Sequence, residues 1–490
     1  MTESEFRQEL KNLSGGYLFF GNEDYLKYSY SKEVKKLILD GTYPNGSKLP
    51  STRNMSVILN VSRNTVDTAY YQLMSEGYID SVPKSGFYVN DISLAHHTSD
   101  ENSDNNENSA SNNNDISEYD YDFSPFEVDI SHFPYSVWKR LSKQILNSTP
   151  DLFLLGDAFG DISLRRAICE YVRLSREVSC TPEQIIVGAG ADYLLQMLSL
   201  MFCHMGVSEI TMENPCYVKA AQIFKNNYIN VHPGELDYKG LIISSISEKS
   251  NIVYVTPSHE YPLGIVMPFG RRKELLDWAC QQENRYIIED DHDSEFRYKG
   301  KPIPSLQGID SHSKVIYSGT FSKAIAPAIR VGYIILPPAL LGKYKQICGH
   351  YSCTVSRFDQ AILANFISQG YFEKHINRMR KIYKSKHDTV LKTLEKYISE
   401  NNLSVSGDHA GMHIVLTLPG NMSSEEVCHL ARKEKIHVYS IKEHYLSIPD
   451  NAPDSLLIGY SNLSEEDIKT GLAKLISICN YLESQATGHL

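Results

Sequence analysis

The stretch SGTFSKAIAPAIRVGY, residues 318–333, decides how the rest of the chain is interpreted. Its serine, glycine and threonine come just before Lys323, and Arg330 follows within the same stretch. A lysine amine can form a Schiff base with an aldehyde, and an arginine can hold a phosphate, so the pair suits an aldehyde cofactor that carries a phosphate. Thr320 adds a hydroxyl donor nearby. A lone lysine is more often a solvated surface side chain. Other parts of the sequence must therefore support the assignment of Lys323 to a cofactor.

Short apolar runs that end in polar or glycine residues recur on both sides of this stretch. They are EQIIVGAG (183–190), NIVYVTPS (251–258), RYIIEDD (285–291) and KVIYSG (314–319). Runs without alternation, separated by helical segments, are typical of a buried, mostly parallel sheet, so the fold class is α/β. Because ligands bind at the carboxyl ends of such strands, we expect the polar residues there to meet.

Two of these strand ends and one further stretch supply what an aldehyde cofactor with a pyridine ring needs. IIEDDHDSEFRY (287–298) offers Asp290, which can keep the ring nitrogen protonated. GAGADYLL (188–195) offers backbone N–H groups around Gly190 and Ala191 for a phosphate. ENPCYVKA (213–220) brings Tyr217 as a stacking platform. Each signal is weak alone, but their order and placement favour one joint site.

The N-terminal part has a different pattern. The segments 28–41, 49–61 and 63–77 have helical spacing of apolar residues, and YIDSVPKSGFYVND (78–91) alternates like two short strands around a turn. Ser51 and Ser62 are the predicted N-caps of the second and third helices. Helix, helix, turn, helix and hairpin form the winged helix-turn-helix pattern.

A recognition helix presents its first turn to base edges, while basic side chains around it hold phosphates. Here the first turn is Arg63, Asn64 and Thr65, which suit guanine, adenine, and a phosphate or methyl group respectively. Lys48, Arg53 and Lys84 are candidates for phosphate contacts. A capped surface helix is the plainer interpretation, but the complete pattern favours a double-stranded DNA operator as partner.

An acidic segment separates the two parts. Residues 96–122 are rich in Asn, Ser, Asp and Glu and nearly lack large aliphatic residues, which predicts a disordered linker. We therefore divide the chain into a DNA-binding domain (1–92), a linker (93–122) and an effector domain (123–490). The net charge of −11 is compatible with DNA binding only because charge is segregated along the chain.

The same sequence argues against several other classes. The first residues lack a signal-peptide pattern, and no apolar run is long enough to span a membrane. The nine cysteines form no CxxC pair, so neither a disulfide framework nor a metal site is expected. These observations predict a cytoplasmic protein without a membrane partner.

Two parts of the chain resemble known protein families. Residues 46–79 and SGFYV (85–89) resemble the head of the GntR family of bacterial regulators. GDISLRRAICEYVRLSREVSCTPEQIIVGAGADYLLQML (160–198), TPSHEYPLGIVMP (256–268), IEDDHDSEFRY (288–298) and GTFSKAIAPAIRVGY (319–333) resemble fold-type-I, aspartate-aminotransferase-like enzymes that use pyridoxal 5'-phosphate (PLP). The combination resembles the MocR subgroup of GntR regulators.

The resemblance implies roles for particular residues. Lys323 is expected to form the Schiff base with PLP, with Asp290 on the pyridine nitrogen, Arg330 and Thr320 on the phosphate, and Tyr217 on the ring. The other implied cofactor contacts are Gly190, Ala191, Tyr261 and His292. The expected DNA contacts are Lys48, Ser51, Arg53, Ser62, Arg63, Asn64, Thr65, Lys84 and Gly86. The subgroup further implies a domain-swapped homodimer and a small-molecule effector.

Several positions depart from the pattern of the family. His292 stands where the subgroup usually has tyrosine, and Lys219 where GABA-sensing relatives carry arginine. Leu457 replaces the arginine with which aminotransferases hold the substrate carboxylate, and Asp67 replaces a phosphate-binding arginine of some GntR heads. Ala189 and Ala191 stand where enzymes commonly place hydroxyl residues. Substrate handling has therefore changed while the cofactor residues are kept.

Three functions are compatible with the sequence. The leading hypothesis is a PLP-dependent transcriptional regulator that senses PLP, GABA or another amine, with a preference for PLP and control of vitamin B6 synthesis. The alternative is an active aminotransferase with a regulatory DNA-binding head. The third is a body that has lost PLP and serves only dimerisation.

Overall fold

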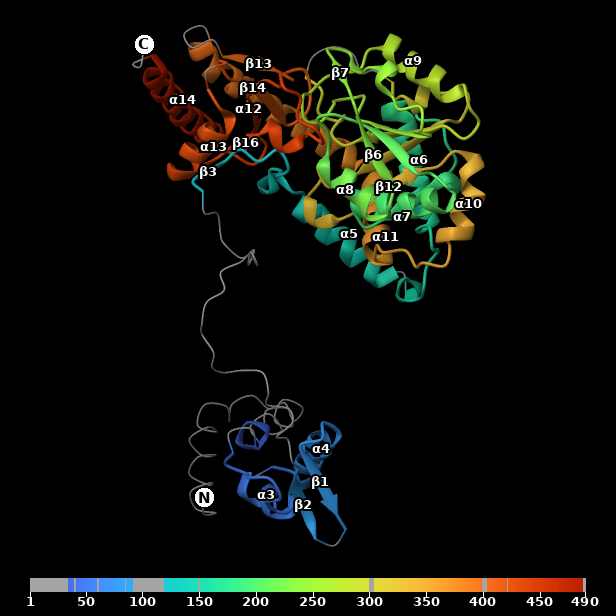
Figure 1. Cartoon of the computed structure of the whole chain (residues 1–490). Coiled ribbons are helices and arrows are strands. Elements are labelled where there is room, and N and C mark those ends of the chain that lie inside the picture. Colours follow the sequence, from blue (N-terminus) through green and yellow to red (C-terminus); the bar gives the residue numbers. More distant parts are fainter. Residues whose placement is uncertain are drawn as a thin grey trace. The chain divides into compact units, whose positions relative to one another are not determined.

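The computed structural model describes residues 34–38, 41–59, 61–83, 85–90, 119–148, 150–298, 304–398, 403–420 and 422–487. The chain divides into two compact units, residues 1–113 and 114–490 (Figure 1). Lys84 and most of the predicted linker lie outside the described residues. The last two linker residues belong instead to the second unit, where Tyr121–Asp122 form strand β3. The other predicted domain limits remain predictions.

The first unit has the predicted order of helices and strands. Helical residues 34–38 precede α3 (Thr52–Leu59) and α4 (Arg63–Ser75), and β1 (Ile79–Val82) pairs with β2 (Gly86–Val89) in an antiparallel hairpin. The two predicted caps are present, because the hydroxyls of Ser51 and Ser62 accept the N–H groups of Asn54 and Thr65. The apolar stripes meet in one core of Val34, Ile38, Leu49, Met55, Val66, Tyr70, Leu73, Ile79 and Val89.

The second unit is built on a seven-stranded sheet of order β4-β12-β11-β10-β9-β5-β6. These strands are β4 (Ile185–Gly188), β12 (Gly332–Ile335), β11 (Val315–Thr320), β10 (Tyr286–Asp291), β9 (Ile252–Val255), β5 (Glu209–Glu213) and β6 (Asn230–Gly234). Only β12 runs antiparallel to its neighbours. The predicted mostly parallel sheet is confirmed.

Helices cover both faces of this sheet, which explains why the strand residues do not alternate. α7 (Gly190–His204), α8 (Val218–Asn226) and α10 (Pro338–Cys348) pack on the face that carries Ile316. α5 (Tyr135–Ser148), α6 (Ile162–Arg176) and α11 (Arg357–Ser368) pack on the face that carries Tyr317. α9 (Phe269–Cys280) covers the β9 end of that second face.

A smaller sheet forms the C-terminal part of the unit, in the order β13 (Ser404–Ser406), β14 (His413–Thr417), β17 (Ser455–Gly459) and β16 (Tyr439–Ser440). Helices α12 (Tyr371–Ile398), α13 (Ser424–Lys433) and α14 (Glu465–Thr487) pack with it, and β3 pairs with β15 (Ile436–His437). A short hairpin of β7 (Leu236–Asp237) and β8 (Gly240–Leu241) follows β6.

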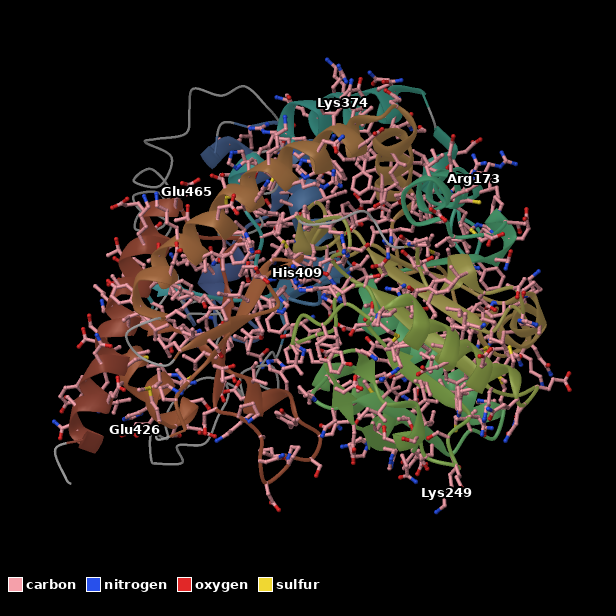
Figure 2. The ribbon with its side chains drawn as sticks, turned by 90° about the horizontal axis from the view of Figure 1, so that it is seen from above. Arg173, Lys249, Lys374, His409, Glu426 and Glu465 are labelled. Carbon is pink, nitrogen blue, oxygen red and sulfur yellow. The ribbon has the colours of Figure 1, made fainter. Side chains whose placement is uncertain are left out.

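The loop before β14 brings the two sheets together. Figure 2 places His409 between the part that carries Glu426 and Glu465 and the part that carries Arg173 and Lys249. Within the described ranges, no helix is both long and apolar enough to cross a membrane.

Candidate cofactor site and DNA-reading surface

Lys323 lies in the turn that follows β11, at the carboxyl end of a central strand. Its Nζ donates to the carbonyl oxygen of Pro125 at 3.2 Å and lies 5.9 Å from the centre of the Tyr261 ring. Burial lowers the pKa of the Lys323 amine, and Asp293 and Asp290 partly oppose this. A lowered pKa increases the fraction of neutral amine, the form that attacks an aldehyde.

Asp290 lies near the end of β10, directly opposite Ser318 of β11. Parallel pairing of these two strands therefore brings the acid and the lysine to the same edge of the sheet. The carboxylate is buried and accepts a hydrogen bond from the hydroxyl of Tyr254, a residue that the sequence analysis did not identify. Burial raises the pKa of Asp290, while His292, Tyr254 and Lys323 oppose that rise.

Arg330 lies against the first residue of α7. Gly190 has φ +83°, and a Cβ there would lie 3.1 Å from Cζ of Arg330. The glycine thus permits both the turn into the helix and the close approach of the guanidinium. Ala191 follows in the first helical turn, and the Thr320 hydroxyl lies 3.1 Å from that of Ser322. Backbone N–H groups, a guanidinium and hydroxyls form a typical phosphate site.

Asp192 is a second residue that the sequence analysis missed, although it directly follows Ala191. Its Oδ2 lies 3.4 Å from Nη2 of Arg330, and its Oδ1 accepts the hydroxyl of Tyr217 at 3.3 Å. The same Arg330 nitrogen donates to the carbonyl oxygen of Ala189 at 3.3 Å. A carboxylate therefore lies beside the predicted phosphate-binding groups.

The ring of Tyr261 lies between two other predicted cofactor residues and contacts both of them. Its ring centre lies 6.3 Å from that of Tyr217 and 5.9 Å from that of His292, both edge-to-face. Its side chain is buried, and among the described residues its hydroxyl has no hydrogen-bond partner. Because a buried, unpartnered hydroxyl is costly, it is suited to a polar ligand atom.

His292 has a carboxylate beside it. Nε2 of His292 lies 3.4 Å from Oδ2 of Asp293, an ion-pair separation that is too long for a good hydrogen bond. Burial lowers the pKa of His292, but Asp293 outweighs it and the net direction is upward. Asp293 is also 3.0 Å from Nδ1 of His259, and these two imidazoles hold the pKa of Asp293 well below its usual range despite burial.

A third imidazole, His413 of β14, completes a buried group with His259 and Asp293. The His413 ring centre lies 5.0 Å from that of His259, and its Nε2 hydrogen-bonds the Pro262 carbonyl. A Cβ at Gly411 would lie 2.1 Å from the His259 ring, so only glycine leaves room for this arrangement. These side chains come from both sheets, and no local sequence signal predicted their meeting.

Leu457 is fully buried on β17 and packs with Val415, Ile441 and Tyr261. The position that the resemblance assigns to carboxylate binding therefore lies in an apolar cluster beside the site. Nζ of Lys219 lies 5.9 Å from the centre of the Phe126 ring.

These residues fit PLP on geometric grounds. One connected region presents an amine of lowered pKa, a buried acid at the adjacent strand end, and an arginine against a helix start. The unpartnered hydroxyl of Tyr261 lies in the same region.

The reading surface of the first unit begins at the capped end of α4. Arg63 and Asn64 are exposed, whereas Thr65 is buried and its hydroxyl lies 2.7 Å from that of Ser62. The hydroxyls of Ser62 and Thr65 are thus already used to start the helix. Asp67 lies one turn further, with Oδ2 3.6 Å from Nε of Arg63.

Lys48, in the segment before α3, lies against strand β2 of the wing. Gly86 has φ +123°, and a Cβ there would lie 3.1 Å from Cε of Lys48. The Lys48 side chain therefore crosses the hairpin, where its Nζ lies 5.8 Å from the centre of the Tyr88 ring. Arg53 is exposed on α3.

Comparisons with known proteins identify both units. Residues 118–475 match the family model "Aminotransferase class I and II", and residues 31–89 match "Bacterial regulatory proteins, gntR family". The chain is 40% identical to "Uncharacterized HTH-type transcriptional regulator YdeL" of Bacillus subtilis, over 91% of this chain and 95% of that protein. It is 31% identical to "Probable rhizopine catabolism regulatory protein MocR" of Rhizobium meliloti, over 92% and 93% of the two chains. The chain belongs to the MocR subgroup of GntR-family transcriptional regulators.

The solved structures agree with the fold of this MocR-type body. The multiple substrate aminotransferase from Thermococcus profundus superposes with a TM-score of 0.68 at 24% identity, covering 76% of this chain and 93% of that one. The predicted α/β fold with a winged helix-turn-helix head and a fold-type-I aminotransferase body is confirmed. The prediction of a transcriptional regulator is confirmed as well.

Proposed function

We propose that this regulator holds PLP at Lys323. Its affinity for DNA would depend on whether PLP, or an amine that has reacted with PLP, is bound there. The observation that carries the proposal is the meeting of Lys323, of lowered amine pKa, with the buried Asp290 at neighbouring strand ends. The dependence of the fold family on PLP supports this proposal.

Each residue would have a defined task. The neutral amine of Lys323 would hold the aldehyde of PLP, and the carboxylate of Asp290, which accepts the Tyr254 hydroxyl, would hold a proton on the pyridine nitrogen. Arg330, Thr320 and the N–H groups at Gly190 and Ala191 bind the phosphate. The cofactor, when bound, supplies a carbonyl that exchanges one amine for another.

The remaining side chains would enclose the ring. Tyr217 provides an aromatic surface, and the hydroxyl of Tyr261 and the imidazole of His292 provide polar contacts at its edge. The nearby carboxylate of Asp293 would favour the protonated form of His292, whose pKa is raised.

DNA recognition would use the start of α4 and the wing. Exposed Arg63 and Asn64 would reach base edges, while the exposed Arg53 and Lys48 would contact phosphates. The Ser62 and Thr65 hydroxyls and the Thr65 N–H stabilise the helix start, so the backbone N–H groups of Arg63 and Asn64 would meet phosphate.

The effector would be PLP itself or an amine that reacts at Lys323. The buried apolar environment of Leu457 argues against strong binding of an amino-acid carboxylate there, which favours PLP over GABA as the effector. Control of vitamin B6 synthesis is the corresponding biological role. We further propose that the protein is a cytoplasmic, domain-swapped homodimer whose two heads read paired half-sites.

The decisive experiment is DNA footprinting with three forms of the full chain: without cofactor, with PLP, and with PLP plus candidate amines. We expect PLP to change both affinity and footprint, with Lys323→Ala unresponsive. A footprint and affinity that are the same in all three forms would contradict the proposal.

A working aminotransferase is the second candidate, favoured by the retention of Lys323, Asp290 and Arg330. Full-turnover assays with pairs of amino and keto acids test it. Sustained turnover would establish an enzyme, whereas conversion of no more than one equivalent per chain supports a sensor.

A further inference from the structure

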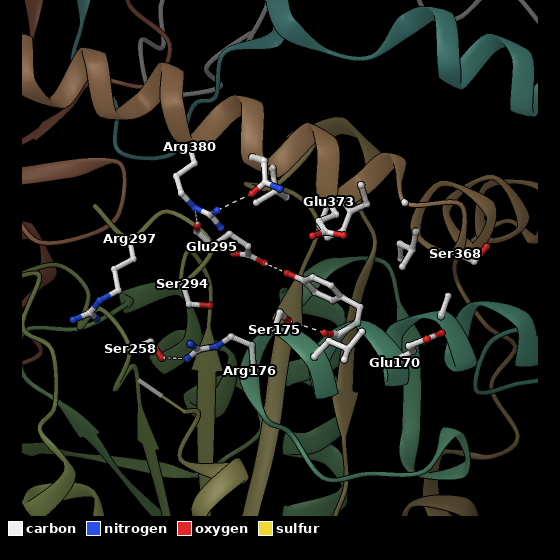
Figure 3. A pocket seen from close by; sticks show the side chains of 18 of the residues that line it. Glu170, Ser175, Arg176, Ser258, Ser294, Glu295, Arg297, Ser368, Glu373 and Arg380 are labelled. Carbon is white, nitrogen blue, oxygen red and sulfur yellow. Dashed lines mark hydrogen bonds between the residues drawn. The ribbon is translucent and has the colours of Figure 1, made fainter. Parts of the chain in front are cut away.

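A cavity of about 680 Å³ opens between α6, the segment after β10 and the start of α12 (Figure 3). None of the predicted cofactor residues lines it. Its volume is within the range of small-molecule sites, and its wall combines charged, hydroxyl and apolar side chains. The residues that carry the argument are Arg380, Glu295, Glu170, Glu373 and Arg176.

One side of the cavity is cationic. Arg380 of α12 donates Nε to the backbone carbonyl of Glu295 at 2.9 Å and Nη1 to Oδ1 of Asn377 at 2.8 Å. Among the described residues no carboxylate lies within ion-pair distance of its guanidinium. Figure 3 shows Arg297 on the same side. A fixed guanidinium without a counter-charge attracts an anionic group.

The opposite side is acidic. Glu170 of α6 and Glu373 of α12 lie there, and within the described part of the chain neither has a cationic partner. The Glu295 carboxylate accepts the hydroxyl of Tyr171 at 2.8 Å. Phe372 adds apolar wall to the cavity. Such a surface suits a ligand with an ammonium group and an apolar body.

We propose that this cavity is a second ligand site, separate from Lys323, for a small amine that also carries an anionic group. The anion would face Arg380, and the ammonium would face Glu170 and Glu373. Amino carboxylates and amines that carry a phosphate share this chemistry.

The wall of the cavity also touches the strand that carries Asp290. Arg176 donates Nε to Oδ2 of Asp291 at 2.7 Å and Nη2 to the hydroxyl of Ser258 at 2.5 Å. Asp291 is the next residue of β10 after Asp290, and Ser258 directly precedes His259. A ligand that contacts Arg176 therefore acts on two segments of the cofactor site, which gives the two sites a physical route for coupling.

The test uses the full chain loaded with PLP and reduced with borohydride, so that the amine of Lys323 can no longer exchange. Calorimetric titrations with aminohexanoate and with pyridoxamine phosphate separate the two sources of the anion. We expect saturable binding of at least one probe, weakened about tenfold or more in Arg380→Gln and in Glu170→Gln. Arg378→Gln, an exposed change on the same helix, should bind like the unchanged protein.

The outcomes are separable from those of the proposed function. Binding of neither probe, or binding that both Arg380→Gln and Glu170→Gln leave unchanged, overturns the second site. Failure to take up PLP contradicts the proposed function instead, and the titrations can then be run on the same chain without reduction.

Discussion

The proposed DNA-reading surface and the proposed cofactor site both use charged side chains, but the surroundings of these side chains differ. The side chain of Arg63 is 67% exposed, and its partner Asp67 is 3.6 Å away across one helical turn. Asp290 is 8% exposed and is held by the hydroxyl of a fully buried tyrosine. The first charge is free to move, and the second is fixed.

This difference follows from what each surface must recognise. An exposed guanidinium stays ionised and adapts to the base edges and phosphates it meets, while solvent screens its interactions with the protein. A buried acid or amine depends on its neighbours for its protonation state, as the shifted pKa values of Asp290 and Lys323 indicate. Substitutions in the two regions should therefore have separable effects.

Removing the amine should have the largest effect. Lys323→Ala is expected to abolish covalent PLP binding, because residues 318–333 hold no other lysine whose amine could form the Schiff base. Visible absorbance and borohydride trapping followed by mass spectrometry measure this, with Lys345→Ala on α10 as the control. DNA affinity without cofactor should not change. Covalent trapping of PLP in Lys323→Ala would contradict the assignment.

Neighbouring acids on β10 allow a direct test of buried charge. Asp291→Asn should lower the free energy of unfolding by about 3–5 kcal/mol, because it leaves the buried Arg176 without its counter-charge. Asp290→Asn should instead weaken PLP binding by about tenfold or more, with a smaller loss of stability. Urea denaturation and PLP titration of both variants separate these effects. Equal losses of unfolding free energy in Asp290→Asn and Asp291→Asn would contradict this prediction.

Burial also predicts a pH dependence that the exposed head should lack. Burial raises the pKa of Glu295 from 4.5 to about 7. Between these values the folded protein keeps a proton that the unfolded chain releases, so the free energy of unfolding falls as the pH rises through this window. Glu295→Gln should remove at most about 3 kcal/mol of this decrease. Urea denaturation from pH 4.5 to 7 measures the free energy of unfolding of both proteins. The same dependence of this free energy on pH in Glu295→Gln and in the unchanged protein would contradict the prediction.

On the exposed side, Arg63→Ala should weaken specific DNA binding by about 1–3 kcal/mol. PLP absorbance should be unchanged, because the side chain belongs to the other unit. Competition binding with specific and random duplexes measures the loss, and Asp80→Ala, an exposed change on β1, serves as the control. A simultaneous loss of PLP absorbance would mean that the two regions are not separable.

The strand ends were predictable because their chemistry is local. Apolar runs buried on both faces, each ending in a polar residue, predicted that Asp290 and Lys323 would lie at one edge of the sheet, and the register of β10 and β11 agrees. The caps at Ser51 and Ser62 were predictable for the same reason. Short-range patterns are enough to specify such features.

Contacts between distant elements were not predictable from one sequence. His259, Asp293 and His413 meet only because the second sheet packs against the first, with Gly411 leaving the space. The cavity beside Arg380 likewise depends on how α6 and α12 are positioned. Side-chain periodicity contains no information about these distances.

Asp192 combines features of both regions, because it is partly exposed yet lies within the cofactor site. Its side chain is 44% exposed and its Oδ2 lies 3.4 Å from Nη2 of Arg330. A phosphate at Arg330 would meet this like charge, so Asp192→Asn should strengthen PLP binding, by about 0.5–1 kcal/mol given the screening by solvent. Titration of PLP at low and high salt measures the gain, which should shrink as salt increases. Asp157→Asn, which changes a partly exposed carboxylate paired with Arg165, controls for the loss of one negative charge. Weaker PLP binding in Asp192→Asn would mean that this carboxylate positions Arg330 for the phosphate rather than competing with it.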